Sequence, residues 1–148
     1  MHESVLLAES IESLNLKEDS IVVDCTLGYG GHSSEILKRI PKGKLYCFDQ
    51  DIDAINFSKN RLNEIASNFE IIQSNFVNIK KELEKRNVTK VDGVLFDLGV
   101  SSPQLDQKER GFSFHQDARL DMRMDKSAKL DAHEVVNTYS LEQLEKIF

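Results

Sequence analysis

The chain has 148 residues, of which 40% are hydrophobic and 30% charged, and its formal net charge is −6. This composition is typical of a folded globular protein and excludes a disordered chain, and no apolar run reaches the roughly 18–20 residues of a membrane-spanning helix. The N-terminal stretch MHESVLLAES has no basic start, so it does not resemble a secretory signal, and we expect a cytoplasmic protein without membrane partners.

Short apolar runs alternate with helical patterns along the first hundred residues. The runs predict strands at 20–25, 44–49, 69–74 and 91–97, and the patterns between and before them predict helices at 4–14, 32–40, 51–66 and 76–87. Nearly continuous apolar strands are typical of a parallel sheet that is covered on both faces. The alternation therefore predicts an α/β fold with a doubly wound sheet.

The pattern breaks after Asp97. Residues 99–130 contain glycine, proline, serine and many charges with little periodicity, and residues 108–129 carry six basic side chains against four acidic ones. A long irregular stretch inside a domain is usually functional or mobile. Two short helical patterns follow at 131–139 and 140–148, the second without a C-terminal cap. Because four strands are visible and the last helix lacks its cap, we expect this chain to be part of a longer protein.

The strand ends carry the candidate chemistry. Asp24 ends the first strand and is followed by a glycine cluster at 28–31, Asp49 ends the second strand, and Asp97 ends the fourth. Open parallel sheets bind ligands beyond these carboxyl ends, where an acid can take both hydroxyls of a ribose. The glycine spacing is G-x-G-G and not the G-x-G-x-x-G of nicotinamide sites, which favours S-adenosylmethionine. A nicotinamide oxidoreductase, or glycines that serve packing alone, remain alternatives.

The two cysteines, Cys25 and Cys47, fall at the ends of apolar runs. We expect buried thiols of a reduced compartment, without a disulfide. Two cysteines at this spacing do not form a ligand set, so we expect no metal site.

Several motifs together resemble one family. The segments HESVLLAE, DCTLGYGGHS, FDQD, LFDLGVSSPQLD, ERGFSF and LDMRMD resemble, in this order, the MraW/RsmH family of S-adenosylmethionine-dependent methyltransferases, which act on the N4 amine of a cytosine in bacterial small-subunit ribosomal RNA. The resemblance spans residues 2 to about 137. It implies a Rossmann-like class I methyltransferase with strand order 3-2-1-4, of which residues 1–148 form the N-terminal part. The family's inserted helical domain and C-terminal strands are absent from this stretch.

The resemblance also implies which residues contact the cofactor. The set is Gly30, Gly31 and His32 at the methionine end, Asp49 at the ribose, Phe76 at the adenine, and Asp97 and Gln104 near the methyl donor. Each has a plainer alternative: a histidine in an exposed first helical turn, a phenylalanine in the core, an aspartate that caps a helix, and a glutamine on the surface.

The mechanism that the resemblance implies requires positioning and hydrogen-bond acceptors. The lone pair of a cytosine amine is delocalised into the ring, so the protein must hold acceptors against the amine hydrogens, and Asp97 is the candidate. Methylation at carbon 5 would require a cysteine nucleophile, and no cysteine follows Pro103. The sequence therefore favours nitrogen as the methyl acceptor.

The target base must leave its stack to reach the cofactor, and aromatic rings often receive such bases. The segment 99–130 is the candidate substrate-facing loop, with RNA contacts predicted at Arg110, Phe112, Phe114 and Arg119. The alternative is that both phenylalanines anchor the loop to the core. This chain departs from the family at Arg119, where proline is usual.

We expect residues 1–148 on their own to bind the cofactor and to methylate poorly or not at all. An apolar sheet edge left after the fourth strand predicts pairing or a homodimer. The alternative in another functional class is a non-catalytic remnant that binds a nucleoside or only self-associates.

Overall fold

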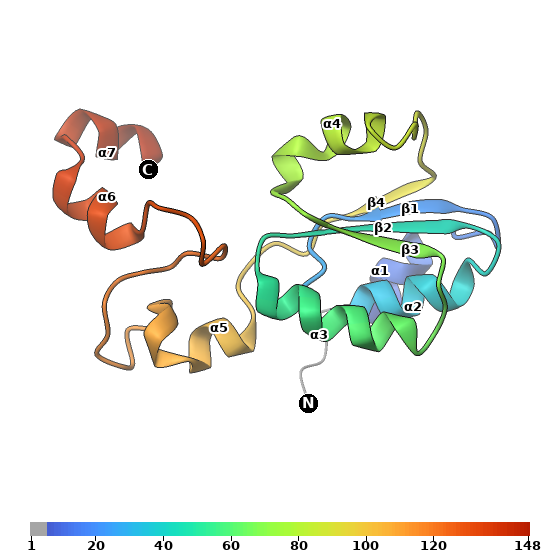
Figure 1. The fold of residues 1–148 in the computed structure, drawn as a ribbon, viewed down its shortest axis with the longest axis horizontal. Coiled ribbons are helices and arrows are strands. Elements are labelled where there is room, and N and C mark those ends of the chain that lie inside the picture. The colour runs from blue at the N-terminus through green and yellow to red at the C-terminus, as the bar shows by residue number, and fades with distance from the viewer. Residues whose placement is uncertain (1–5) are drawn as a thin grey trace. The chain divides into compact units, whose positions relative to one another are not determined.

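The computed structural model describes residues 6–148, which form two compact units that divide between Gly99 and Val100. The first unit contains the sheet, and the second contains short helices joined by loops (Figure 1). The helix predicted at 4–14 begins at Leu7, and residues 4 and 5 lie outside the described part of the chain.

The four predicted strands form one parallel sheet, which confirms the α/β fold and the order β3-β2-β1-β4. The strands are β1 (Ile21–Asp24), β2 (Lys44–Asp49), β3 (Phe69–Gln73) and β4 (Gly93–Leu95). In the register of the sheet, Asp24 lies opposite Cys47 and Leu95, and Asp49 lies opposite Gln73. The two aspartates therefore end neighbouring strands at the same edge of the sheet.

Helices cover both faces of the sheet. They are α1 (Leu7–Ser13), α2 (Gly31–Arg39), α3 (Ile52–Asn63), the 3-10 turn η1 (Phe76–Asn78) and α4 (Ile79–Glu84). Figure 1 shows α1, α2 and α3 below the sheet and α4 above it. Side chains alternate along a strand. Val22 and Leu45 therefore belong to the core between the sheet and the helices α2 and α3, whereas Val23 and Tyr46 belong to the core between the sheet and α4.

The second unit is more regular than its sequence predicts. It contains α5 (Ser102–Asp106), the 3-10 turn η2 (Lys108–Arg110), α6 (Ala132–Thr138) and α7 (Leu141–Ile147). Ser101 and Ser140 each begin a capping box, with Gln104 and Gln143 as the third helical residues. The expectation that residues 99–130 lack regular structure is therefore wrong for 102–110, while the two C-terminal helices are confirmed.

The outer strands of the sheet are β3 and β4. Next to the β4 edge, the side chains of Val94 and Phe96 are partly exposed. The homodimer through this edge stays a prediction. Within residues 6–148, none of the helices has the length and apolar character to cross a membrane.

Candidate cofactor and catalytic site

The turn between β1 and α2 is fastened to α3. Gly28 and Gly30 have φ of +51° and +80°, a left-handed conformation that glycine adopts without strain. Ser58 of α3 donates a hydrogen bond from Oγ to the Gly28 carbonyl (2.7 Å), and Arg61 donates to the Tyr29 carbonyl (3.0 Å). A Cβ at Gly30 would lie 3.2 Å from Ser58 Oγ, so the main chain packs against α3 where a side chain would not fit.

Asp49 joins this turn to the end of β2. One carboxylate oxygen accepts a hydrogen bond from the Gly28 amide (2.8 Å), and the other accepts one from the Asp51 amide (2.9 Å). Burial raises the pKa of the Asp49 carboxyl, and these amides oppose that rise. Backbone amides thus hold the carboxylate in place. A carboxylate has about four lone-pair sites, so this one can still accept a hydrogen bond from a ligand hydroxyl.

Asp24 is buried completely beneath the turn. Its carboxylate accepts hydrogen bonds from Ser33 Oγ (2.6 Å) and from the Thr26 amide (3.0 Å). Burial raises the pKa of Asp24, and the Ser33 hydroxyl opposes the rise. Asp24 therefore ties the strand end to the first turn of α2 and does not face a ligand.

Replacing Asp24 with asparagine is expected to remove a pH-dependent loss of stability. Because its pKa is raised above 3.8 in the folded state, the folded chain retains a proton that the unfolded chain has already released. The free energy of unfolding that Asp24 contributes therefore falls as the pH rises from about 4 through the raised pKa. Urea unfolding at a series of pH values should show the wild type losing stability relative to Asp24→Asn as pH increases. Parallel curves for the two proteins would contradict this assignment.

Asp97 lies two residues beyond β4. Its backbone amide donates to Thr26 Oγ1 (2.7 Å), which fixes the main chain at the end of β4 to the start of the β1–α2 turn. Its carboxylate lies 3.7 Å from Nδ1 of His32, and the Asp97 side chain is 45% exposed. His32 is buried at 5% exposure, which excludes the alternative of an exposed first-turn histidine.

Phe76 follows β3 in the turn η1, which Asn75 caps through the Val77 amide. Its ring meets Phe96 edge-on, with centroids 5.4 Å apart. Phe76 also packs on the core under α4, so it is half-buried, and Phe96 is 50% exposed. The two rings form an apolar wall at the ends of β3 and β4.

Both cysteines are buried and free, as predicted. Burial raises the pKa of the Cys25 thiol to about 12 and raises that of Cys47 as well. A thiol attacks as its thiolate, so neither cysteine is a nucleophile in this environment. Among residues 6–148, no group of histidine, cysteine and acidic side chains could hold a metal ion.

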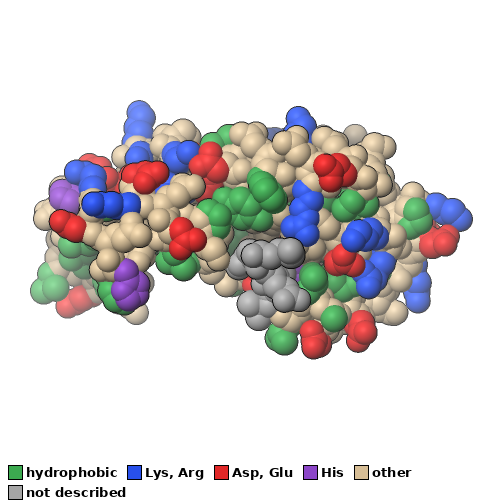
Figure 2. All heavy atoms as spheres, turned by 90° about the horizontal axis from the view of Figure 1, so that it is seen from below, with side chains coloured by type: hydrophobic (Ala, Val, Ile, Leu, Met, Phe, Trp, Pro, Cys, Tyr) green, Lys and Arg blue, Asp and Glu red, His purple; other side chains and the backbone are tan. Residues whose placement is uncertain are grey.

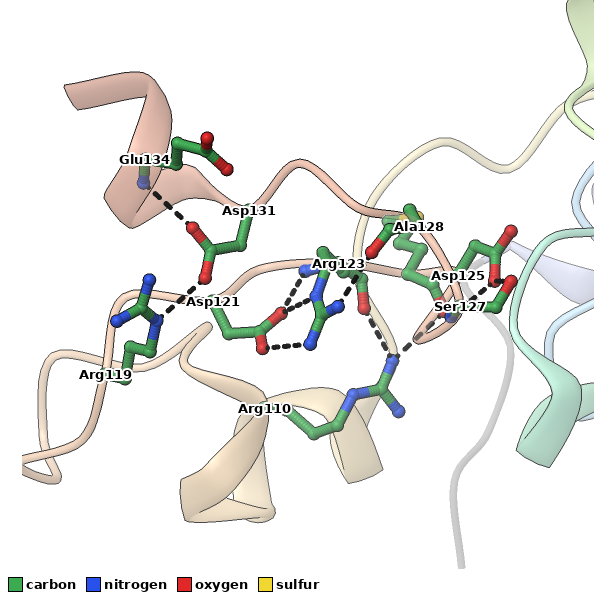
Figure 3. Close-up of polar contacts among 10 residues, drawn as sticks. Arg110, Arg119, Asp121, Arg123, Asp125, Ser127, Ala128, Asp131 and Glu134 are labelled. Atoms are coloured by element: carbon green, nitrogen blue, oxygen red, sulfur yellow. Dashed lines mark hydrogen bonds and ion pairs between the residues drawn. The ribbon is translucent and has the colours of Figure 1, made fainter. Parts of the chain in front are cut away.

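Arg110 has a structural role within the second unit. It is 5% exposed, and its guanidinium donates to the carbonyls of Arg123 (3.1 Å) and Met124 (3.3 Å). Arg123 in turn forms a bidentate pair with Asp121, at 2.9 and 2.8 Å (Figure 3). This burial corrects the expectation that Arg110 contacts RNA directly, because the side chain is enclosed and its Nη2 donates to the carbonyls of Arg123 and Met124.

The other predicted RNA residues differ in exposure. Arg119 pairs with Asp131 (2.8 Å), whose carboxylate also caps α6 (Figure 3). The Phe112 ring lies 5.8 Å from the Arg110 guanidinium and is half-buried, as an anchoring residue would be. Phe114 is 93% exposed, and its ring lies at a tilt of 38° to that of His115, with centroids 4.4 Å apart. Of the two phenylalanines, Phe114 is the one free to receive a base.

Gln104 lies in the second unit, where its side-chain oxygen accepts the Ser101 amide (3.0 Å). It is buried, so the alternative of a surface residue is wrong. Its contact with the cofactor stays a prediction. The glycines, His32, Asp49, Phe76 and Asp97 all belong to the first unit.

Sequence reasoning missed the residues that hold the site together. Thr26 positions Asp97, and Ser58 and Arg61 hold the glycine turn. Thr26 sits in the DCTLGYGG motif and could have been singled out. Ser58 and Arg61 lie about thirty residues from their partners on an ordinary helical pattern, and no spacing rule connects them to the turn.

A family model described as the MraW methylase family matches residues 1–148. The chain is 58% identical to a ribosomal RNA small subunit methyltransferase H from Exiguobacterium sibiricum over 99% of its own length and 47% of that protein. It is 57% identical to a protein of the same name from Mycoplasmopsis agalactiae, over 99% of the chain and 49% of that protein. The chain thus spans about half the length of these curated relatives.

Solved structures give the same fold. An rRNA methylase from Streptococcus thermophilus superposes with a TM-score of 0.54 at 24% identity, over 67% of this chain and 57% of that one. This likeness supports the Rossmann-like α/β architecture.

Proposed function

The chain belongs to the MraW methylase family, and from that premise we propose that it is the cofactor-binding part of an S-adenosylmethionine-dependent methyltransferase of small-subunit ribosomal RNA. The observation that carries the proposal is the set of fixed groups at the carboxyl edge of the sheet. The amide-held Asp49, the glycine turn and Asp97 come from three strand ends of one unit.

The chemistry of these groups fits S-adenosylmethionine. Asp49 offers two fixed carboxylate oxygens for the ribose hydroxyls, and Phe76 offers an apolar surface for the adenine. Gly30 and Gly31 lead into α2, whose N-terminus has no side-chain cap among the described residues and so attracts the negative end of the amino-acid tail. When bound, the cofactor supplies an electrophilic methyl group on a sulfonium.

We propose the N4 amine of a cytosine as the acceptor. The relatives are named for methylation of small-subunit ribosomal RNA, and the exclusion of both cysteines as nucleophiles argues against carbon 5. Asp97, anchored through its amide and partly exposed, accepts hydrogen bonds from the amine. This contact orients the nitrogen lone pair, and the negative carboxylate stabilises the positive charge that develops on nitrogen.

We place the RNA contact in one segment of the chain and not on a broad basic surface. On the face drawn in Figure 2, basic and acidic side chains are interspersed, in keeping with the net charge of −6. The exposed ring of Phe114, with His115 beside it, supports a role for the segment 99–130 as the substrate-facing loop, because exposed aromatic rings stack on unpaired bases. The partner we propose is the small ribosomal subunit.

Calorimetry and methyl-transfer assays test this proposal. We expect residues 1–148 to bind S-adenosylmethionine and not NADH, and we expect them alone to methylate small subunits poorly or not at all. A protein of the length of the curated relatives, with these residues as its N-terminal part, should produce N4-methylcytidine in small-subunit RNA. In that protein Asp97→Asn should reduce turnover by a larger factor than it weakens cofactor binding. Binding of NADH instead, or full turnover by Asp97→Asn, would refute the respective part. Binding of neither ligand would favour a non-catalytic remnant.

A further inference from the structure

His32 and Asp97 form an unusual pair at the proposed site. His32 is the second residue of α2 and is buried at 5% exposure, yet its Nε2 has no hydrogen-bond partner among the described residues. Its other nitrogen, Nδ1, lies 3.7 Å from a carboxylate oxygen of Asp97. This separation is too long for a direct hydrogen bond and short enough for electrostatic attraction.

The geometry favours one of the two tautomers of the neutral ring. A neutral imidazole has one N–H donor and one acceptor, and a carboxylate favours the donor on the nitrogen that faces it. The position of Asp97 points to the tautomer with the proton on Nδ1, in which Nε2 is an acceptor. Asp24 is the other carboxylate with an electrostatic effect on His32, but its oxygens already accept from Ser33 and Thr26.

Asp97 needs such a partner. The bond from its amide to Thr26 fixes its main chain, but it does not fix the direction of the carboxylate. In the described part of the chain, His32 is the chargeable side chain that the structure brings within 4 Å of this carboxylate. Hydrogen bonds that are long without ligand often shorten when the reactive complex forms.

We propose that His32 is a positioning residue for Asp97: its Nδ1–H holds the carboxylate in the direction in which the carboxylate accepts hydrogens from the substrate amine. This inference rests on the proposed function, because it assigns Asp97 that acceptor role. It is distinct from the expected contact of His32 with the methionine end of the cofactor, because it concerns the side chain and the carboxylate.

Nitrogen-15 NMR of the histidine ring tests the pairing on the 148-residue chain itself. At a pH where the ring is neutral, we expect the proton of His32 on Nδ1, and we expect Asp97→Ala to shift the population toward the Nε2–H form. His133 is exposed on α6 and serves as the internal control, since its ring should not respond. An Nε2–H ring in the wild type, or no response to Asp97→Ala, would overturn the proposal even if S-adenosylmethionine binds as expected.

Kinetics on a protein of the relatives' length, with these residues as its N-terminal part, test the consequence. His32→Leu removes the donor and should lower kcat by roughly 10–100-fold, the range seen for residues that orient metal ligands. The fall in kcat should exceed any rise in the KM for S-adenosylmethionine, which His32 also contacts in the proposed site. His32→Asn offers an N–H near the position of Nδ1 and should recover most of kcat. Equal losses in both variants, together with equal falls in melting temperature, would indicate a merely structural role and overturn the proposal. An inactive wild type would instead refute the proposed function, and the NMR result would still stand.

Discussion

Replacing Asp49 with alanine is expected to weaken the binding of S-adenosylmethionine by roughly 100-fold. The carboxylate is held by the Gly28 and Asp51 amides, so it meets a ribose without first losing side-chain freedom. Hydrogen bonds to a charged group contribute about 1.5–3 kcal/mol each, and two ribose hydroxyls together account for a loss of this size. Titration calorimetry of the 148-residue chain measures it directly.

Ser58→Ala is the control that distinguishes the effect of the Asp49 carboxylate from the effect of the glycine turn. Ser58 Oγ donates to the Gly28 carbonyl but is not one of the proposed ligand contacts. Its removal should therefore weaken the free energy of cofactor binding by about 1 kcal/mol, which is a several-fold loss of affinity. Thermal unfolding of both variants verifies that the fold is intact. If Asp49→Ala binds within about 3-fold of the wild type, Asp49 does not hold the ribose.

Replacing Gly43 with alanine is expected to cause a large loss of stability, roughly 3 kcal/mol, or about 10 °C in melting temperature. Gly43 lies in the turn between α2 and β2, where the Lys44 amide donates to the Ser20 carbonyl (3.1 Å) and the Lys42 amide donates to the Glu18 carbonyl (2.8 Å). A Cβ at Gly43 would overlap the Ser20 carbonyl oxygen. Because both sides of this contact are backbone, neither can move without breaking the pairing of the two segments.

Gly93→Ala is the matched control in the same sheet. A Cβ there would lie 3.1 Å from Leu14 Cδ2, and the end of a leucine side chain can move away. We expect a change within about 1 kcal/mol, since alanine also reduces the freedom of the unfolded chain. Circular dichroism melts of the two variants should differ clearly, and equal melting temperatures would contradict the backbone overlap.

The sheet was predictable because its signals are local. Apolar strand runs, helical periodicity between them and acids at the strand ends each follow from a few neighbouring residues, and parallel pairing then brings Asp24, Asp49 and Asp97 to one edge. The segment 99–130 was harder because its order comes from charge pairs and main-chain carbonyls. The sequence predicts that Arg110 is an exposed charge. Its burial depends on hydrogen bonds to carbonyls 13 and 14 residues away.

By itself the sequence determined the α/β class, the strand ends that carry acids, and the motifs that mark the family. The tertiary structure decided what each acid does. Asp24 and Asp49 end adjacent strands in similar sequence surroundings. Asp24 is fully buried and accepts a hydrogen bond from Ser33, whereas Asp49 is partly exposed and accepts one from Gly28 of the glycine turn. The pairing of His32 with Asp97 likewise joins residues 65 positions apart. Burial and long-range contacts depend on which segments pack together, and that information is not present in any short stretch of the chain.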